Sequence, residues 1–148
     1  MSAGCRKSAL RFLKIRPRSV AELKSKLEAK GFEAPEIDQT LQWLQDIKLL
    51  DDRSFTKSWI HYRLARPFGF RRIILELKTK GVDPDLIEEE ISLVKGDTDE
   101  SKIAFDLASR RWKKLVRVEP IKRKKRMFDF LSRRGFAPDV VFKVLKML

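Results

Sequence analysis

The chain has 148 residues, of which 43% are hydrophobic and 37% are charged, enough apolar material for one compact domain or a short array of small units. No run of eighteen apolar residues occurs and the N-terminus lacks an apolar signal core, so we expect a soluble, cytoplasmic protein. The single cysteine, Cys5, has no internal disulfide partner, which agrees with a reducing compartment. We interpret it as a small residue packed near the start of a helix.

The net charge of +13 is concentrated in the last third of the chain. Residues 1–50 hold 10 basic and 6 acidic side chains, and residues 51–100 hold 9 and 11. Residues 101–148 hold 15 basic and 4 acidic side chains, a net charge of +11. Clustered cations attract polyanions, so the sequence predicts a polyanion-binding surface toward the C-terminal end.

Three helices are expected in the first fifty residues. The first covers Ala9–Ile15. Ser19 and Glu22 have the S-x-x-E spacing of a capping box, which predicts the start of a second helix. That helix ends at Gly31 and is followed by a third.

The same order recurs twice along the chain. A helix over Ser54–Ala65, with Asp52 as its N-cap, opens the second group, and a helix over Ser101–Leu115 opens the third. Asp97 and Glu100 are interpreted as a weaker capping box before the latter helix. The first helix of each group ends before a proline, which disfavours helical conformation in the preceding residue. These prolines are Pro17, Pro67 and Pro120.

The middle helix of each group ends at a glycine: Gly31, Gly81 or Gly135. Glycine takes the left-handed conformation after a helix without a Cβ clash, and a preceding cation favours the negative end of the helix dipole. Apolar residues four and eight positions earlier form a stripe that leads into the turn, and a proline opens the next helix. The aligned residues are Leu23, Leu27, Lys30 and Pro35; Ile73, Leu77, Lys80 and Pro84; and Met127, Leu131, Arg134 and Pro138.

These patterns predict an all-α protein of three tandem three-helix repeats, over residues 1–50, 51–96 and 97–148. A unit of about 50 residues has a thin core, so we expect the repeats to pack end to end into an elongated, curved array. Long exposed faces of this kind suit a large partner better than a small substrate.

No pattern in the sequence favours catalysis or metal binding. His61, the single histidine, is interpreted as a surface or partner-packing residue. Asp51 and Asp52 would suit a metal-dependent nuclease, but a helix N-cap explains them better. The run Glu88–Glu90 points in three directions around a helix, so we interpret it as a solvated face or one turned toward basic protein. We therefore expect no enzyme, no cofactor and no metal site.

Binding to a polyanion is better supported. The segment from Arg110 to Arg126 holds ten basic residues in seventeen, opposed only by Glu119. Lys122–Arg126 fall in the first turns of a helix, where the dipole disfavours cations and an anionic partner would relieve the repulsion. The expected partner- or nucleic-acid-binding residues are Arg66, Arg71, Arg72, Arg110, Arg111, Lys113, Lys114, Lys122, Arg123, Lys124, Lys125, Arg126, Arg133 and Arg134.

Aromatic residues occur near these cations. Phe68 and Phe70 stand among three arginines, which suits single-stranded nucleic acid or an acidic protein groove, while two core phenylalanines beside solvated arginines explain the pattern at least equally well. Trp43, Trp59 and Trp112 occur among apolar helix positions, which favours packing within or between repeats over base stacking.

Three segments carry a family resemblance. They are RPRSVAELKSKLEAKGF (Arg16–Phe32), LLDDRSFTKSWIHYRLARPFGFRRIILELKTKGV (Leu49–Val82) and RRGFAPDVV (Arg133–Val141). Together they resemble the RecX family of bacterial recombination regulators. The segments occur in the family's order and span nearly the whole chain, and LLDD followed by a Phe, a Trp and a Gly-x-Arg-Arg-Ile segment is specific.

The resemblance implies tandem three-helix repeats in a crescent. It also implies an inhibitory regulator in DNA repair, recombination and the SOS response, which binds the RecA recombinase chiefly as its filament on single-stranded DNA. Such a protein blocks filament growth or promotes disassembly, and so suppresses ATPase, strand-exchange and coprotease activities. Weaker direct binding to single-stranded or double-stranded DNA, no membrane, no cofactor and a monomeric state are also expected.

Two alternatives stay open at this point. A stand-alone nucleic-acid-binding protein without RecA specificity would use a recognition helix that exposes several Arg, Asn or Gln side chains. The helix expected from Pro138 offers mainly apolar side chains instead. A scaffold that binds neither RecA nor DNA would leave the C-terminal charge unexplained.

Overall fold

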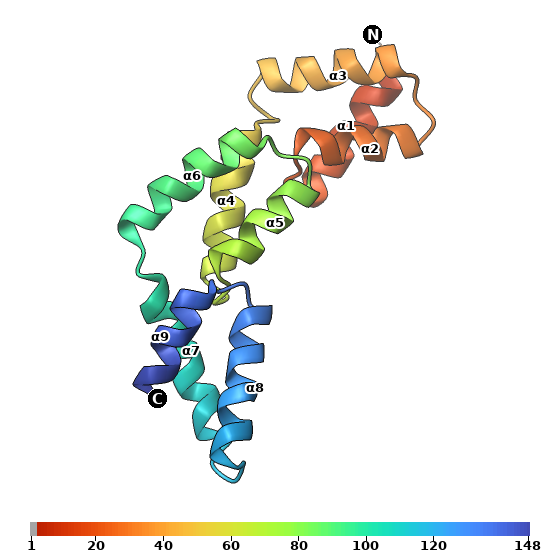
Figure 1. The fold of residues 1–148 in the computed structure, drawn as a ribbon. Coiled ribbons are helices and arrows are strands. Elements are labelled where there is room, and N and C mark those ends of the chain that lie inside the picture. Colours follow the sequence, from red (N-terminus) through yellow and green to blue (C-terminus); the bar gives the residue numbers. More distant parts are fainter. Residues whose placement is uncertain (1–2) are drawn as a thin grey trace.

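The computed structural model describes residues 3–148, and this part of the chain forms nine α-helices and no β-strand. The helices fall into three groups of three. Repeat 1 contains α1 (Ala3–Ile15), α2 (Val20–Ala29) and α3 (Ala34–Asp46); repeat 2 contains α4 (Asp52–Leu64), α5 (Phe70–Thr79) and α6 (Pro84–Asp97); repeat 3 contains α7 (Glu100–Lys113), α8 (Pro120–Arg133) and α9 (Pro138–Met147). The repeats follow one another along an elongated, bent body (Figure 1). The predicted all-α repeat fold is therefore confirmed.

Each repeat has a hydrophobic core of its own. The three buried clusters contain residues of α1–α3, of α4–α6 and of α7–α9 respectively, each cluster also taking in residues from the turns that follow its helices. All six apolar residues predicted before the glycines have no exposed surface: Leu23, Leu27, Ile73, Leu77, Met127 and Leu131. Cys5 is buried in the first core, as its interpretation as a small packed residue predicts. Because each buried cluster stays within one repeat, other interactions must orient the repeats.

The glycine turns have the predicted geometry. Gly31, Gly81 and Gly135 adopt φ values of 90°, 77° and 91°, in the left-handed region. In repeat 1 the amide of Phe32 donates to the carbonyl of Leu27 at 3.3 Å, which closes the turn after α2. Prolines lie in the first turns of α3, α6 and α9, as predicted. The capping box at the start of α2 is also present. No helix within residues 3–148 has the length and apolar character needed to cross a membrane.

Two N-caps differ from the predicted residues. Asp51, rather than Asp52, caps α4, and its carboxylate accepts hydrogen bonds from two backbone N–H groups of the first turn. Asp99 caps α7 by accepting one hydrogen bond, from the amide of Lys102, whereas Asp97 is the last residue of α6. Asp52 and Glu100 are instead the first residues of α4 and α7, and their side chains bond to the preceding repeat.

Repeats 1 and 2 are joined through helix ends. The Ser19 hydroxyl, at the start of α2, donates to the carbonyl of Lys80 at the end of α5 over 2.5 Å. The next amide, that of Val20, donates to Oδ1 of Asp52 at 2.8 Å. A salt bridge of 3.2 Å between Lys80 Nζ and Glu22 Oε2 closes the same contact. The neighbouring repeat thus provides the acceptor for the first amide of α2, that of Val20.

Repeats 2 and 3 are joined at the corresponding positions. The amide of Gly69, before α5, donates to the carbonyl of Arg134 at the end of α8 over 2.7 Å. The amide of Phe70 donates to Oε1 of Glu100 at 3.2 Å, as Val20 does to Asp52. We call these two sets of contacts the repeat junctions. The same helix-end geometry is therefore used twice.

The junctions place the middle helices end to end. The C-terminal end of α8 meets the start of α5, and the C-terminal end of α5 meets the start of α2, as the ribbon shows (Figure 1). Opposite ends of successive helix dipoles therefore meet, which is electrostatically favourable. This line of helices gives the molecule its length.

Two of the turn glycines lie inside a junction. A Cβ on Gly135 would overlap the backbone and Cβ of Arg72, and a Cβ on Gly81 would overlap the Cβ of Ala21. Gly31, at the free end of α2, has nothing within 4 Å of the corresponding position. The three turns therefore share their backbone conformation, but only those at Gly81 and Gly135 pack against the first turn of a helix in another repeat.

This difference predicts unequal effects of alanine at equivalent positions. Gly31→Ala should lower the free energy of unfolding by about 1 kcal/mol, the cost of a left-handed alanine. Gly135→Ala should cost about 3 kcal/mol, because Arg72 and the docked start of α5 must also move. Urea denaturation measures both losses, and amide hydrogen exchange at Gly69 should accelerate only in Gly135→Ala. Equal losses in the two variants would contradict a close-packed junction.

Candidate functional site

An exposed basic cluster lies at one end of the molecule, around the turn between α7 and α8 (Figure 1). Its members are exposed side chains from the end of α7 and the first turns of α8: Lys113, Lys114, Lys122, Lys124, Lys125 and Arg126. We call this set the tip cluster. None of the six forms an ion pair with residues 3–148. The first turn of α8 contains no acidic side chain, so these charges are available to an external anion.

Three other predicted binding residues of this segment are used inside the repeat. Nη2 of Arg123 donates to the carbonyl of Trp112 at 2.6 Å, and its guanidinium lies 3.7 Å from the centroid of the Trp112 ring. Arg111 lies 4.5 Å from the ring centroid of Phe130. Arg110 donates to a backbone carbonyl one turn earlier, at 3.3 Å. Arg123 and Arg111 therefore help to hold α7 against α8.

Phe68 lies where repeats 2 and 3 meet, and guanidinium groups cover it. Arg63, Arg72 and Arg134 lie 4.5, 4.7 and 4.8 Å from its ring centroid. Phe70 is only 3% exposed. Both phenylalanines are thus engaged in packing, so the structure favours the core interpretation of these rings over base stacking.

The remaining predicted binding residues also fall into two groups, one engaged in contacts within the protein and one exposed. Arg66 lies 4.4 Å from the ring centroid of Tyr62. Arg71 and Arg133 are exposed, form no ion pair with the described residues and line one groove together with Lys78. Lys78 was not predicted as a site residue. The sequence could have indicated it, because Lys78 follows Arg71 by seven residues and so lies on the same face of one helix.

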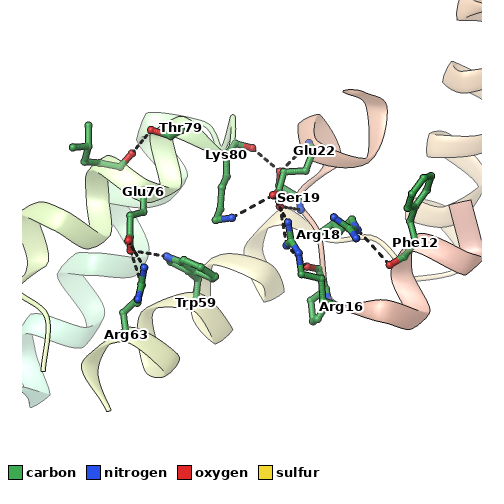
Figure 2. A network of polar contacts seen from close by, with 12 residues as sticks. Phe12, Arg16, Arg18, Ser19, Glu22, Trp59, Arg63, Glu76, Thr79 and Lys80 are labelled. Carbon is green, nitrogen blue, oxygen red and sulfur yellow. Dashed lines mark hydrogen bonds and ion pairs between the residues drawn. The ribbon is translucent and has the colours of Figure 1, made fainter. Parts of the chain in front are cut away.

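A polar network connects repeats 1 and 2 (Figure 2). Glu76 accepts hydrogen bonds from Nε1 of Trp59 at 3.2 Å and from Nε of Arg63 at 2.8 Å. Lys80 lies over the same indole, with Nζ 4.4 Å from the ring centroid, and also bonds to Glu22. Sequence reasoning missed this network because its members lie on α2, α4 and α5. Arg63 and Lys80 belong to this network, so these two cations are already paired within the protein.

The Glu22 carboxylate at the centre of this contact has an unusually low pKa. Burial alone would raise its pKa, but hydrogen bonds from Arg16, the Ser19 amide and Lys80 outweigh burial and lower it to about 2. At Asp52 burial dominates and raises the pKa of the carboxyl, although the Val20 amide opposes the effect. The pKa values of these two carboxyl groups of one junction are therefore shifted in opposite directions.

The interpretation of Glu88–Glu90 as a solvated face was wrong for Glu90. Its side chain is 3% exposed and bonds to Nη1 of Arg53 at 2.8 Å, while Glu89 bonds to Nη2 of the same arginine, also at 2.8 Å. These hydrogen bonds raise the pKa of the Arg53 guanidinium. The acidic run is therefore used to fasten the start of α4 to α6.

The tryptophans pack at the edges of the three cores, as predicted. Trp43, Trp59 and Trp112 are partly buried against the clusters of repeats 1, 2 and 3. Arg6 lies 4.1 Å from the ring centroid of Trp43. Each indole therefore has a cation over it within the same repeat.

His61 is exposed on α4, in agreement with its interpretation as a surface residue.

Fold and surface together define a protein built of tandem three-helix repeats with a basic tip and a second basic groove. The model of the RecX family's first three-helix domain matches residues 5–44, that of its second residues 51–90 and that of its third residues 98–145. The chain belongs to the RecX family.

Curated relatives agree with this assignment. The chain is 34% identical over 145 residues to the regulatory protein RecX of Legionella pneumophila (strain Corby), covering 94% of this chain and 91% of the relative. It is 32% identical over 146 residues to the regulatory protein RecX of Clostridium perfringens (strain SM101), covering 97% of this chain and 68% of the relative. These names support a regulatory role of the RecX type.

A solved structure shares the fold. The crystal structure of RecX from Lactobacillus salivarius superposes with a TM-score of 0.85 at 21% identity, covering 99% of this chain and 95% of that one. A likeness at this identity supports the arrangement of the helices.

The low pKa of Glu22 predicts a pH-dependent contribution to stability. A carboxylate with a lowered folded-state pKa stabilises the fold above its unfolded pKa, near 4.5, and loses that contribution as the pH falls toward 2. Glu22→Gln should therefore cost about 2 kcal/mol at pH 6, and the difference from the unsubstituted protein should shrink between pH 4.5 and 2. Urea denaturation across this range measures it, with the exposed Glu28→Gln as control. A difference independent of pH would contradict the assignment.

Neighbouring basic residues of α8 should behave differently in stability measurements. Arg123→Ala should lower the free energy of unfolding by about 2 kcal/mol, because the contacts to the ring and carbonyl of Trp112 are lost. Lys124→Ala, at an exposed position of the same helix, should change it by less than about 0.5 kcal/mol. Thermal unfolding of the two variants compares them directly, and similar losses would show that Arg123 is not structural.

Proposed function

We propose that this protein inhibits RecA by binding it and its filament on single-stranded DNA. Bound protein blocks filament growth or promotes disassembly, and so suppresses the ATPase, strand-exchange and coprotease activities of RecA in the cytoplasm. The observation that carries the proposal is an elongated array of the RecX family with an uncompensated tip cluster at one end. No catalytic step is assigned to the protein.

The shape supports binding to a polymer. We propose that residues 1–50, 51–96 and 97–148 act as three successive contact units. A bent rod can lie along a helical filament and contact several subunits, which suits inhibition at amounts well below one molecule per RecA. The tip cluster provides the attraction, since cations that meet phosphates release counterions.

The alternative is a stand-alone nucleic-acid-binding protein that acts without RecA specificity. A recognition helix in such a protein exposes side chains that can read base edges. The exposed large side chains of α9 are Phe142 at 54%, Met147 at 55% and two lysines, Lys143 and Lys146, and the helix contains no Arg, Asn or Gln. The surface of α9 therefore gives this alternative little support.

The test is RecA's ATP hydrolysis on single-stranded DNA, measured while this protein is added far below the RecA concentration. Inhibition is expected under these conditions. Lys124→Glu with Lys125→Glu should weaken inhibition at least tenfold, because two tip-cluster cations become repulsive. Lys24→Glu with Lys26→Glu, an exposed pair on repeat 1, is the matched control.

A parallel titration varies the DNA concentration alone. Inhibition that begins only when the protein coats the DNA would overturn the proposal and support the alternative. Full inhibition by the tip-cluster variant would show instead that these lysines are not the binding surface.

A further inference from the structure

A groove of about 860 Å³ lies on repeat 2, where α5 approaches the C-terminal end of α8. Trp59 and Arg63 of α4 form one part of its wall, the exposed face of α5 forms another, and Ser132 and Arg133 of α8 close its end. The tip cluster, at the other end of α8, contributes none of its residues to this lining.

One stripe of α5 combines charge with apolar surface. Arg71, Leu75 and Lys78 have the i, i+4 and i+7 spacing that places them on one face of the helix. Leu75 is 65% exposed, although it lies between two cations. Arg133 adds a third cation to the same groove. None of these three cations forms an ion pair with residues 3–148.

The other cations of the groove are already paired inside the protein (Figure 2). Arg63 and Arg72 pair with Glu76, and Lys80 pairs with Glu22. Arg63 and Lys80 also lie over the Trp59 ring, at 5.1 and 4.4 Å from its centroid. The groove therefore offers three free charges and an exposed leucine, but its indole is not open for a base to stack on.

We propose that this groove binds an acidic amphipathic helix of a partner protein. An apolar side chain of that helix covers Leu75, and carboxylates two turns apart meet Arg71 and Lys78, which are separated by about 10 Å along α5. The inference deepens the proposed function and rests on it for the identity of the partner, because RecA would then supply the acidic helix.

Leu75 distinguishes this occupant from nucleic acid. A phosphate backbone would gain from Arg71, Lys78 and Arg133 but would gain nothing from a leucine between them. Base stacking, which gives single strands much of their affinity for proteins, needs open aromatic faces. A partner helix uses both the charges and the apolar surface of the stripe, so it accounts for all of its residues.

Fluorescence anisotropy with two labelled probes tests the proposal. One probe is a designed helical peptide with glutamates seven residues apart and leucines between them, and the other is an oligothymidylate of about 15 nucleotides. Leu75→Ser should weaken peptide binding about tenfold and leave oligothymidylate binding unchanged. Leu93→Ser is the matched control, since Leu93 on α6 is also 65% exposed.

A charge variant completes the set. Lys78→Glu should weaken peptide binding at least tenfold, whereas Lys57→Glu, at an exposed position of α4, should not. No peptide binding by the unsubstituted protein, or equal binding by Leu75→Ser, would overturn the proposal. Loss of oligothymidylate binding in Lys78→Glu without any effect of Leu75→Ser would show that the groove holds nucleic acid.

The ATPase assay separates this inference from the function on which it rests. If the unsubstituted protein inhibits RecA and Leu75→Ser weakens inhibition about tenfold, both proposals are supported. If Leu75→Ser inhibits as well as the unsubstituted protein does, the groove inference fails while the proposed function stands. If the unsubstituted protein does not inhibit RecA, the proposed function fails, and the peptide titration alone decides on the groove.

Discussion

The overall shape depends on how the first turn of each middle helix is satisfied. A helix leaves its first N–H groups without partners, and here the following repeat provides an acceptor for the first of them. Asp52 accepts from Val20 and Glu100 accepts from Phe70, at the same position of two junctions. Because the hydrophobic cores stay within single repeats, these few polar contacts decide how the repeats are oriented. A junction of this kind joins units without merging their hydrophobic cores.

The basic character of the chain has two separate uses. Several guanidinium groups lie over aromatic rings that the small cores leave partly exposed, as Arg123 does over Trp112. Others, such as Lys124 and Arg71, point outward and have no partner ion within residues 3–148. The net charge of the chain therefore overstates the number of cations that are available to a partner. The charges that we propose for binding are those of the tip cluster and of the groove on repeat 2.

Patterns of neighbouring residues were sufficient to predict the helices and turns, but not the contacts between residues far apart in the sequence. The turn at Gly81 follows from chemistry within a few residues, so the sequence was sufficient there. Arg53 and Glu90 are 37 residues apart, and nothing in the local pattern showed that the glutamate would be buried. Asp52 was predicted as a cap because an acidic residue before a helix is usually one. Its actual partner lies on another repeat, so only the packed array could reveal it.

The junctions also explain why α8 is the exceptional middle helix. The starts of α2 and α5 each meet a carboxylate of the next repeat, whereas α8 belongs to the last repeat of the described residues. Its first residue, Pro120, has no N–H to donate, and Glu119 makes no side-chain capping bond. Lys122, Lys124 and Lys125 then add positive charge to the positive end of the dipole. With no capping bond and added cations, the start of α8 differs in charge from the starts of α2 and α5, which agrees with an acidic or phosphate-bearing partner at the proposed tip cluster.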